Sequence, residues 1–344
     1  MSNQEKVLEV VKNYPLLSSS EIHEKHGLDI SFATTKRLLA KLVLENLIES
    51  EGKGKGTKYK VSIASQIIKK VDLEEYYKQE IDERTIKRQF DFELINDVLR
   101  TVNLFNEEEL KKLNSLQNQF SLKSQELSQF EFEKEMERLA IDLSWKSSEI
   151  EGNTYSLLET ERLLKEKITA EGKTKDEATM LLNHKDALDF ILQNPDYLKE
   201  LTVAKIENIH SVLVKDLQID RNIRKRRVGI SGTNFKPIDN EFQIKEALQS
   251  MCDLVNAKSS VFEKSLFIIV LISYIQPFND GNKRTARIVS NAILIDKNFC
   301  PISFRTVDSI EYKKALLLFY EQNNISAFKE IFIEQFEFAV DTYF

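Results

Sequence analysis

The longest apolar run in the chain, Phe267–Ile275, is interrupted only by Ser273. It has about half the length that a membrane-spanning helix needs, so we do not expect it to cross a bilayer. A helix that is apolar on every side must instead be surrounded by protein. The run therefore predicts a core helix.

The composition favours helices around that centre. The 344 residues include only 9 glycines and 5 prolines, which argues against a loop-rich or disordered chain. Met1–Tyr14 lacks the apolar stretch of a signal peptide, and Cys252 and Cys300 are expected to be reduced, buried thiols. The sequence predicts a mainly α, cytoplasmic protein without a membrane segment, long enough for two or three domains.

Residues 1–62 have the pattern of a small domain of their own. Apolar spacing and turn residues predict three helices and then two strands around a glycine-lysine turn, at residues 4–13, 18–25, 31–44, 47–50 and 57–61. Asp29 or Ser31 would cap the third helix. This order resembles that of winged helix-turn-helix domains.

The charge of this domain has the sign expected for contact with DNA. Residues 1–62 carry a net charge of +2, against −8 for the rest of the chain. The resemblance implies that the third helix enters the major groove and that lysines of the wing contact phosphates. The candidate DNA-binding residues are Thr34, Thr35, Arg37, Lys53 and Lys55. The alternative is a winged helix that binds protein, with a solvated basic loop.

Two regions follow this domain. Residues 63–135 are charged and helical in spacing, which predicts a helical linker or extension packed on the core. Residues 136–344 predict a helical bundle with one short β-hairpin near residues 226–236.

The segment Ile275–Arg287 carries the most informative chemistry. An apolar helix ends at Pro277, a polar loop follows, and a new helix starts near Asn282. Free backbone N–H groups at a helix start bind anions. Gly281 lets the backbone approach a ligand closely, because it has no side chain to clash.

Three cations, Lys283, Arg284 and Arg287, lie at the start of that second helix. Positive charge there opposes the helix dipole, so it destabilises the helix unless an anion is bound. Asp280 is placed to hold Mg²⁺ together with phosphate oxygens. The segment therefore predicts a Mg²⁺–polyphosphate site; the alternative is a solvated basic helix start.

The segment Gln276–Arg287 resembles the signature of the Fic family, His-x-Phe-x-Asp/Glu-Gly-Asn-Gly/Lys-Arg-x-x-Arg, at every defined position except the first. The resemblance covers about residues 136–344. Fic proteins typically transfer AMP from ATP to a Ser, Thr or Tyr hydroxyl of a target protein. The resemblance thus implies a Fic-type helical core, ATP as substrate or ligand, and Mg²⁺ held by Asp280.

The resemblance also implies a role for each matching residue. Gly281 and Asn282 would bind the α-phosphate, and Lys283 and Arg284 the neighbouring phosphates. Arg287 would bind the γ-phosphate. Asn282 and Arg284 would in addition be catalytic residues.

The remaining catalytic position is Gln276, where the family has a histidine that deprotonates the target hydroxyl. Glutamine cannot take up a proton near neutral pH, and loss of a general base costs ~10²–10⁴-fold in rate. His184 and His210 are each interpreted as packed members of a helix face rather than substitute bases. Two outcomes stay open: a slow transferase, or a nucleotide-binding protein that no longer transfers.

Ser147 and Glu151 are four residues apart and share one face of a helix that ends at Gly152. The three residues match the Fic inhibitory motif Ser/Thr-x-x-x-Glu-Gly/Asn. Glu151 would pair with Arg287 and so compete with the γ-phosphate. The alternative is an ordinary acid at a helix end.

Residues 228–237 contain a glycine turn between β-type residues. By the resemblance they form the flap, a hairpin that docks the backbone of the target by strand addition. The candidate flap residues are Ile230, Gly232, Thr233 and Asn234. A plain structural hairpin is the alternative, and the preceding run Arg224–Arg227 is either a solvated turn or a contact for an acidic partner.

Three functions follow from these features. The first is an autoinhibited AMP transferase acting on an unidentified target protein. The second is a DNA-binding transcriptional regulator that senses nucleotide through an inactive Fic core. The third is an oligomeric scaffold. A homodimer is a further candidate partner state.

Overall fold

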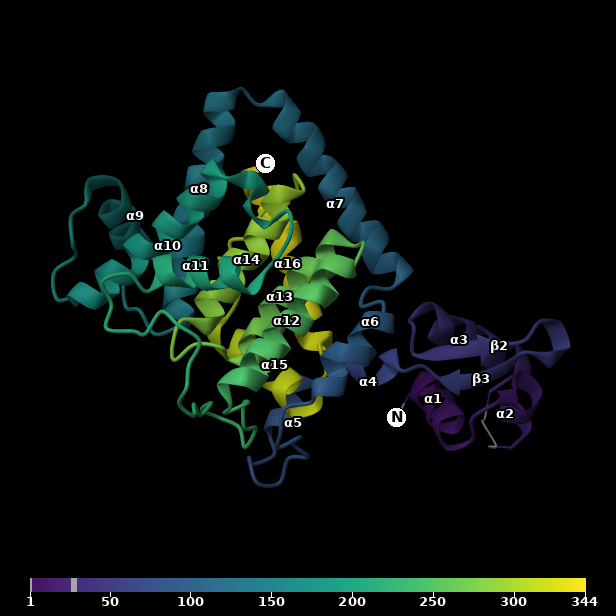
Figure 1. Ribbon diagram of the computed structural model, residues 1–344. Coiled ribbons are helices and arrows are strands. Elements are labelled where there is room, and N and C mark those ends of the chain that lie inside the picture. The colour runs from purple at the N-terminus through teal and green to yellow at the C-terminus, as the bar shows by residue number, and fades with distance from the viewer. Residues whose placement is uncertain (1, 26–29) are drawn as a thin grey trace.

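The computed structural model describes residues 2–25 and 30–344. A small N-terminal unit lies beside a large helical body (Figure 1). The unit consists of α1 (Asn3–Asn13), α2 (Ser19–Lys25), α3 (Phe32–Leu44), β1 (Leu17–Ser18), β2 (Ile48–Glu51) and β3 (Lys58–Val61). The strands pair antiparallel in the order β1-β3-β2. The predicted order of three helices and a hairpin is present, with β1 as an additional short strand.

The N-terminal unit has an apolar core of its own, formed by Val7, Leu8, Val10, Val11, Ile22, Leu39, Leu42 and Ile48. Ser31 caps α3, because its side chain accepts a hydrogen bond from the Thr34 backbone N–H at 3.2 Å. The other predicted cap, Asp29, lies outside the described residues.

The candidate DNA-binding residues of this unit differ in exposure. Arg37 and Lys53 are exposed and Thr34 is half-buried, whereas Thr35 is fully buried and its Oγ1 lies 3.0 Å from His23 Nδ1. Thr35 points into the core of the unit and is not available to a DNA groove, which corrects the expectation for this residue. The side chain of Lys55 lies outside the described part of the chain.

The region between the N-terminal unit and the body is only partly helical. Its helices are α4 (Ala64–Ile68), α5 (Leu73–Tyr77), a π-helical turn (Leu94–Val98), α6 (Leu99–Thr101) and α7 (Glu107–Glu126). The rest runs along the body as irregular chain, joined to it by backbone hydrogen bonds such as Lys87 N–H to Glu321 O at 2.8 Å.

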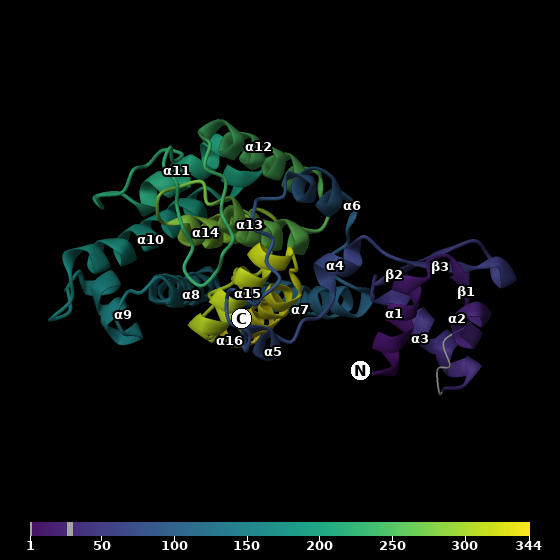
Figure 2. The same ribbon diagram turned by 90° about the horizontal axis from the view of Figure 1, so that it is seen from below.

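The body is a bundle around one central helix. Its helices are α8 (Gln129–Ile150), α9 (Leu157–Glu166), α10 (Lys175–Gln193), α11 (Val203–Leu213), α12 (Glu241–Ala257), α13 (Val261–Ile275), α14 (Asn282–Asp296), α15 (Ser309–Gln322) and α16 (Ser326–Tyr343). Helix α13 lies in the middle of the others in both views (Figures 1 and 2). Every residue of Phe267–Ile275 is buried, so the predicted core helix is confirmed.

Within residues 2–25 and 30–344, no helix combines the length and the apolar character that a bilayer crossing requires.

The β-hairpin predicted near residues 226–236 is absent. The turn at Ser231–Gly232 is present, but Lys236 forms a parallel bridge with Gln89 instead of pairing with the other arm of the turn. The two arms therefore do not pair with each other, because one of them finds its backbone partner in the segment that precedes the body. Residues 228–237 are called the flap segment below.

Candidate active site

The site is built where α13 gives way to α14. Gln276 ends α13 in the left-handed conformation (φ 52°), and Gly281 precedes α14 with φ 78°. A Cβ atom at Gly281 would lie 3.3 Å from Cε1 of His210 in a backbone conformation that favours glycine. No side chain caps α14. Its first N–H groups therefore lack a side-chain partner of the kind that usually satisfies a helix start.

Asn282 stabilises the loop between α13 and α14 through side-chain hydrogen bonds. Its Oδ1 accepts a hydrogen bond from Phe278 N–H at 2.8 Å, and its Nδ2 donates to Phe278 O at 2.8 Å and to Gln276 Oε1 at 3.0 Å. The other end of the Gln276 amide donates to Ser273 O at 2.6 Å. Gln276 thus serves as a bridge between α13 and Asn282, and both ends of its amide are in use.

Arg284 and Arg287 are buried but only partly hydrogen-bonded. Arg284 is 1% exposed and Arg287 fully buried, yet Nε and Nη1 of Arg284 and Nη1 of Arg287 lack a partner among the described residues. Burial lowers the pKa of Arg284, and the positive charge of Arg287 lowers it further. The carboxylates of Asp280 and Glu151 raise this pKa, but the net change is a decrease. Unsatisfied N–H groups of buried cations are costly, so these atoms fit an anionic ligand such as phosphate.

Asp280 lies at the exposed edge of this pair of arginines. Its Oδ1 accepts a hydrogen bond from Gly281 N–H at 2.6 Å, its Oδ2 lies 3.2 Å from Arg284 Nη2, and its side chain is 57% exposed. Among the described residues, no three His, Cys, Asp or Glu side chains gather to hold a metal ion by themselves. One accessible carboxylate beside a phosphate site nevertheless fits Mg²⁺, which usually takes one or two carboxylates and completes its shell with phosphate and water oxygens.

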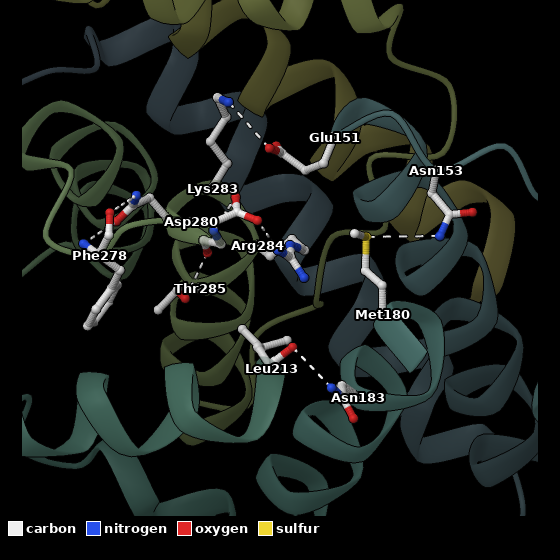
Figure 3. Close-up of polar contacts among 12 residues, drawn as sticks. Glu151, Asn153, Met180, Asn183, Leu213, Phe278, Asp280, Lys283, Arg284 and Thr285 are labelled. Atoms are coloured by element: carbon white, nitrogen blue, oxygen red, sulfur yellow. Dashed lines mark hydrogen bonds and ion pairs between the residues drawn. The ribbon is translucent and has the colours of Figure 1, made fainter. Parts of the chain in front are cut away.

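Glu151 closes the site from the end of α8 (Figure 3). Its Oε1 lies 3.3 Å from Arg287 Nη2 and its Oε2 3.4 Å from Lys283 Nζ. Burial by itself raises the pKa of Glu151, but the positive charges of Lys283, Arg287 and Arg284 outweigh it, and the net pKa is lowered. The carboxylate is therefore ionised at neutral pH and neutralises part of the cationic group.

Ser147 holds Arg287 from the same helix. Arg287 Nε donates to Ser147 Oγ at 2.8 Å, and Nη2 donates to Ser147 O at 2.8 Å. Helix α8 ends immediately after, with Gly152 at φ 98°. The predicted face shared by Ser147 and Glu151, and the predicted pairing of Glu151 with Arg287, are both present in the structure.

Neither histidine of the body is placed as a substitute base. His210 is fully buried, stacks on Phe278 with ring centroids 3.6 Å apart, and has its Nδ1 3.1 Å from Thr285 Oγ1. Burial lowers the pKa of His210 to about 4. His184 is also fully buried, and burial lowers its pKa as well. Both rings are neutral at pH 7 and enclosed by protein, in agreement with the packed role expected from the sequence.

Sequence reasoning missed Arg224. This residue belongs to the basic run interpreted as solvated or as a contact for a partner, but it is fully buried. Its backbone N–H donates to Pro277 O at 2.9 Å and its Nε to Gln276 O at 2.6 Å. Arg224 therefore supports the loop from behind. Nothing in its sequence neighbourhood distinguishes it from the exposed Lys225 and Arg226.

The flap segment reaches the end of α13. Phe235 is buried and stacks on Tyr274 at 5.0 Å between ring centroids, two residues before Gln276. Gly232 is exposed, and Ile230, Thr233 and Asn234 are half-buried. The structure thus brings the loop between α13 and α14, the end of α8 and the flap segment together. Helix α3, with Thr34 and Arg37, and the β2–β3 turn, with Lys53, belong to the separate N-terminal unit, which lies beside the body in Figure 1.

Comparison with known proteins shows which family this site resembles. Residues 197–294 match the model of the Fic/DOC family. Protein adenylyltransferase fic-1 of Caenorhabditis elegans is 26% identical over 174 residues, which are 48% of this chain and 34% of that protein. Protein adenylyltransferase Fic of Nematostella vectensis is 27% identical over 177 residues, which are 50% of this chain and 41% of that protein. The match thus spans about a third to two fifths of the length of these curated relatives.

Solved structures show the same fold. A fragment of Fic-1 from C. elegans superposes with a TM-score of 0.60 at 22% identity, covering 69% of this chain and 72% of the fragment. A Fic-domain-containing signaling protein from Bacteroides thetaiotaomicron gives a TM-score of 0.57 at 20% identity, covering 69% of this chain and 94% of that one. The helical body therefore has a Fic-type fold.

Proposed function

We propose that this chain, whose residues 197–294 match the Fic/DOC family model, binds ATP with Mg²⁺ and has the architecture of an AMP transferase. Transfer of AMP to a Ser, Thr or Tyr hydroxyl of a target protein is restrained by Glu151, and it is slowed or lost through Gln276. The observation that carries this proposal is the pairing of Glu151 with Arg287 and Lys283 at 3.3 and 3.4 Å.

The binding step uses the cations and the helix start. Those N–H groups of Arg284 and Arg287 that have no partner among the described residues donate hydrogen bonds to phosphate oxygens, and Gly281 lets the phosphate chain approach the first N–H groups of α14. Asp280 would hold Mg²⁺, which supplies positive charge to the phosphates when bound. Glu151 repels the phosphates and occupies Arg287, so ATP is disfavoured in the pose that exposes its α-phosphate to attack.

The transfer step is a displacement at the α-phosphorus. The target hydroxyl oxygen forms the new P–O bond, the bond from the α-phosphorus to the bridging oxygen of the β-phosphate breaks, and pyrophosphate leaves. The hydroxyl proton must pass to water or to a phosphate oxygen, because the Gln276 amide cannot take it. Positioning and charge stabilisation by the phosphate-binding residues remain available without a base.

ATP labelled at the α-phosphate tests this proposal. Candidate target proteins, including a lysate, should become labelled weakly by the native chain, more by Glu151→Gly, and most by Glu151→Gly combined with Gln276→His. Arg287→Ala in the double variant is the control and should abolish labelling. A double variant that is thermally stabilised by ATP–Mg²⁺ yet labels no protein would show that the domain binds nucleotide without transferring it.

A second function is supported by the N-terminal unit. Arg37 on α3 and Lys53 in the turn between β2 and β3 are exposed, as a winged helix that reads DNA requires. We therefore also propose a DNA-binding regulator that senses nucleotide through the body. Gel retardation at low salt, with and without ATP, tests it, and the apparent affinity should fall steeply with salt. Lack of retardation for every DNA tried at low salt would exclude it.

Two measurements test the scaffold and the homodimer hypotheses, one for each. A scaffold without a nucleotide site predicts no rise in melting temperature with ATP–Mg²⁺, whereas nucleotide at about 100 times Kd stabilises a protein by roughly 2.7 kcal/mol. A homodimer predicts twice the mass of the chain in light scattering. A cytoplasmic location remains a prediction that imaging of the tagged chain tests.

A further inference from the structure

The flap segment is held by the irregular chain that precedes the body. Lys236 N–H donates to Arg88 O at 3.1 Å, within the parallel bridge between Lys236 and Gln89. Asn234 Nδ2 donates to Asp82 Oδ1 at 2.9 Å. Residues 82–89 therefore already occupy the edge of the flap segment at Lys236, and a docking peptide cannot pair there.

Arg84 makes the contact with the turn of the flap segment. Its Nη2 donates to Gly232 O at 3.1 Å. Gly232 is exposed, with φ 87°, so water could satisfy this carbonyl equally well. Arg84, a buried residue that is 8% exposed, does so instead.

The rest of the Arg84 side chain is fixed by the core. Nη1 donates to both carboxylate oxygens of Glu321 in α15, at 3.1 and 3.2 Å, and Glu321 is fully buried. Glu321 also accepts a hydrogen bond from Tyr76 at 2.7 Å, and the guanidinium lies over the ring of Tyr77, 5.1 Å from its centroid. Glu321 and Tyr77 thus hold the guanidinium with Nη2 directed toward the flap segment.

The flap segment is also supported by the end of α13, next to the loop that joins α13 to α14. Phe235 stacks on Tyr274 of α13 and lies 5.8 Å from the ring of Tyr320, centroid to centroid. Together, Phe235 and Arg84 define where the turn at Gly232 lies relative to Gln276. Arg84 donates directly to the Gly232 carbonyl in the turn.

We propose that Arg84 is a positioning residue for the flap segment. Anchored by Glu321, it fixes the turn at Gly232, and the free part of the flap segment then presents a target backbone to the phosphate-binding loop. The docking part of this inference rests on the proposed function. The fixing of the turn does not, because it follows from the contacts of Arg84 alone.

Amide hydrogen exchange of the full chain tests the fixing of the turn. In Arg84→Lys, the single ammonium keeps a partner in Glu321 but cannot reach Gly232 at the same time, because it lacks the forked donors of arginine. Exchange in residues 228–237 should accelerate about tenfold to a hundredfold, the factor that corresponds to one hydrogen bond from a charged group. Exchange in α13 should not change.

A second variant and a matched control complete the exchange experiment. Arg84→Met with Glu321→Gln removes both charges and keeps an acceptor for Tyr76, and it should accelerate the same amides. Lys112→Met removes an exposed ion pair between α7 and α16, Lys112 with Glu337 at 2.8 Å, and should leave residues 228–237 unchanged. Unchanged exchange in residues 228–237 in both Arg84 variants would overturn the proposal.

Transfer kinetics test the docking step. In the Glu151→Gly, Gln276→His background, Arg84→Lys should raise the KM for the target protein about tenfold and leave the Kd for ATP unchanged. If that background labels no protein, the proposed transfer fails while the exchange result still decides the role of Arg84. If the background transfers AMP and KM stays the same in Arg84→Lys, Arg84 does not act on docking.

Discussion

The Arg287 guanidinium lies 3.3 Å from the Glu151 carboxylate and joins the first turns of α14 to the end of α8. The same guanidinium donates to Ser147, and its Nη1 has no hydrogen-bond partner within the described part of the chain. One arginine therefore has a carboxylate partner and an unused hydrogen-bond donor in the same place. A γ-phosphate bound at Arg287, as we propose, competes directly with Glu151.

Glu151→Gly should strengthen ATP–Mg²⁺ binding, by roughly tenfold. The carboxylate that repels the phosphates is removed, and Arg287 and Lys283 become free to bind them. Calorimetric titration of the native chain and the variant measures this. Glu149→Ala is the matched control, because Glu149 pairs with Lys146 at 2.7 Å and not with the cations of α14. Equal affinities in Glu151→Gly and the native chain would contradict the competition.

Gln276→His in the Glu151→Gly background should raise the rate of AMP transfer by ~10²–10⁴-fold, the usual contribution of a general base. The gain should appear as pH rises through about 6.5, where histidine loses its proton. The parent with Gln276 should show no such step, because its amide does not titrate in that range. Initial rates over the neutral pH range measure both curves, and parallel curves would show that position 276 does not accept the proton.

His210 should make folding sensitive to mild acid. Its pKa is lowered from 6.5 to about 4, mainly by burial and further by Arg284, with Asp220 acting in the opposite direction. Between pH 6.5 and 4 the unfolded chain binds a proton at this residue that the folded chain does not. The contribution of His210 to the free energy of unfolding is thus fully present above pH 6.5. It falls by roughly 3 kcal/mol as the pH decreases to about 4, and it changes no further below that pH.

Urea unfolding at a series of pH values measures this dependence. The difference between the native chain and His210→Asn, which does not titrate, isolates the contribution of His210 from those of the carboxylates. The prediction is wrong if the difference in unfolding free energy between the two chains is the same at every pH. His210 would then gain its proton without loss of stability, although its ring is buried and stacks on Phe278.

Thr35→Val should destabilise the N-terminal unit, by about 1 kcal/mol. The change removes the hydroxyl that lies 3.0 Å from His23 Nδ1 in the core of the unit. Thr34→Val, one residue away and half-buried, should leave folding nearly unaffected and weaken DNA retardation instead. Thermal unfolding of both variants measures the contrast, and equal melting temperatures would show that the Thr35 hydroxyl contributes nothing.

Local sequence was sufficient for the parts of the site that lie within one element or one turn. The apolar run Phe267–Ile275 determined a buried helix, because no face of it could be left in water. The four-residue spacing of Ser147 and Glu151 determined that both side chains leave one face of α8. The glycine and the cations after Pro277 determined a helix start that lacks a side-chain cap.

Tertiary structure decided the features whose partners come from distant parts of the chain. The flap segment has the composition of a hairpin, but its backbone pairs with Gln89, far away in sequence. Arg224 and Thr35 resemble exposed polar residues in their local context and are buried. A local pattern shows which residues prefer burial or an extended backbone, but not which group will satisfy them. That group is selected by packing, because buried hydrogen-bonding atoms must be paired with whatever the fold brings within reach.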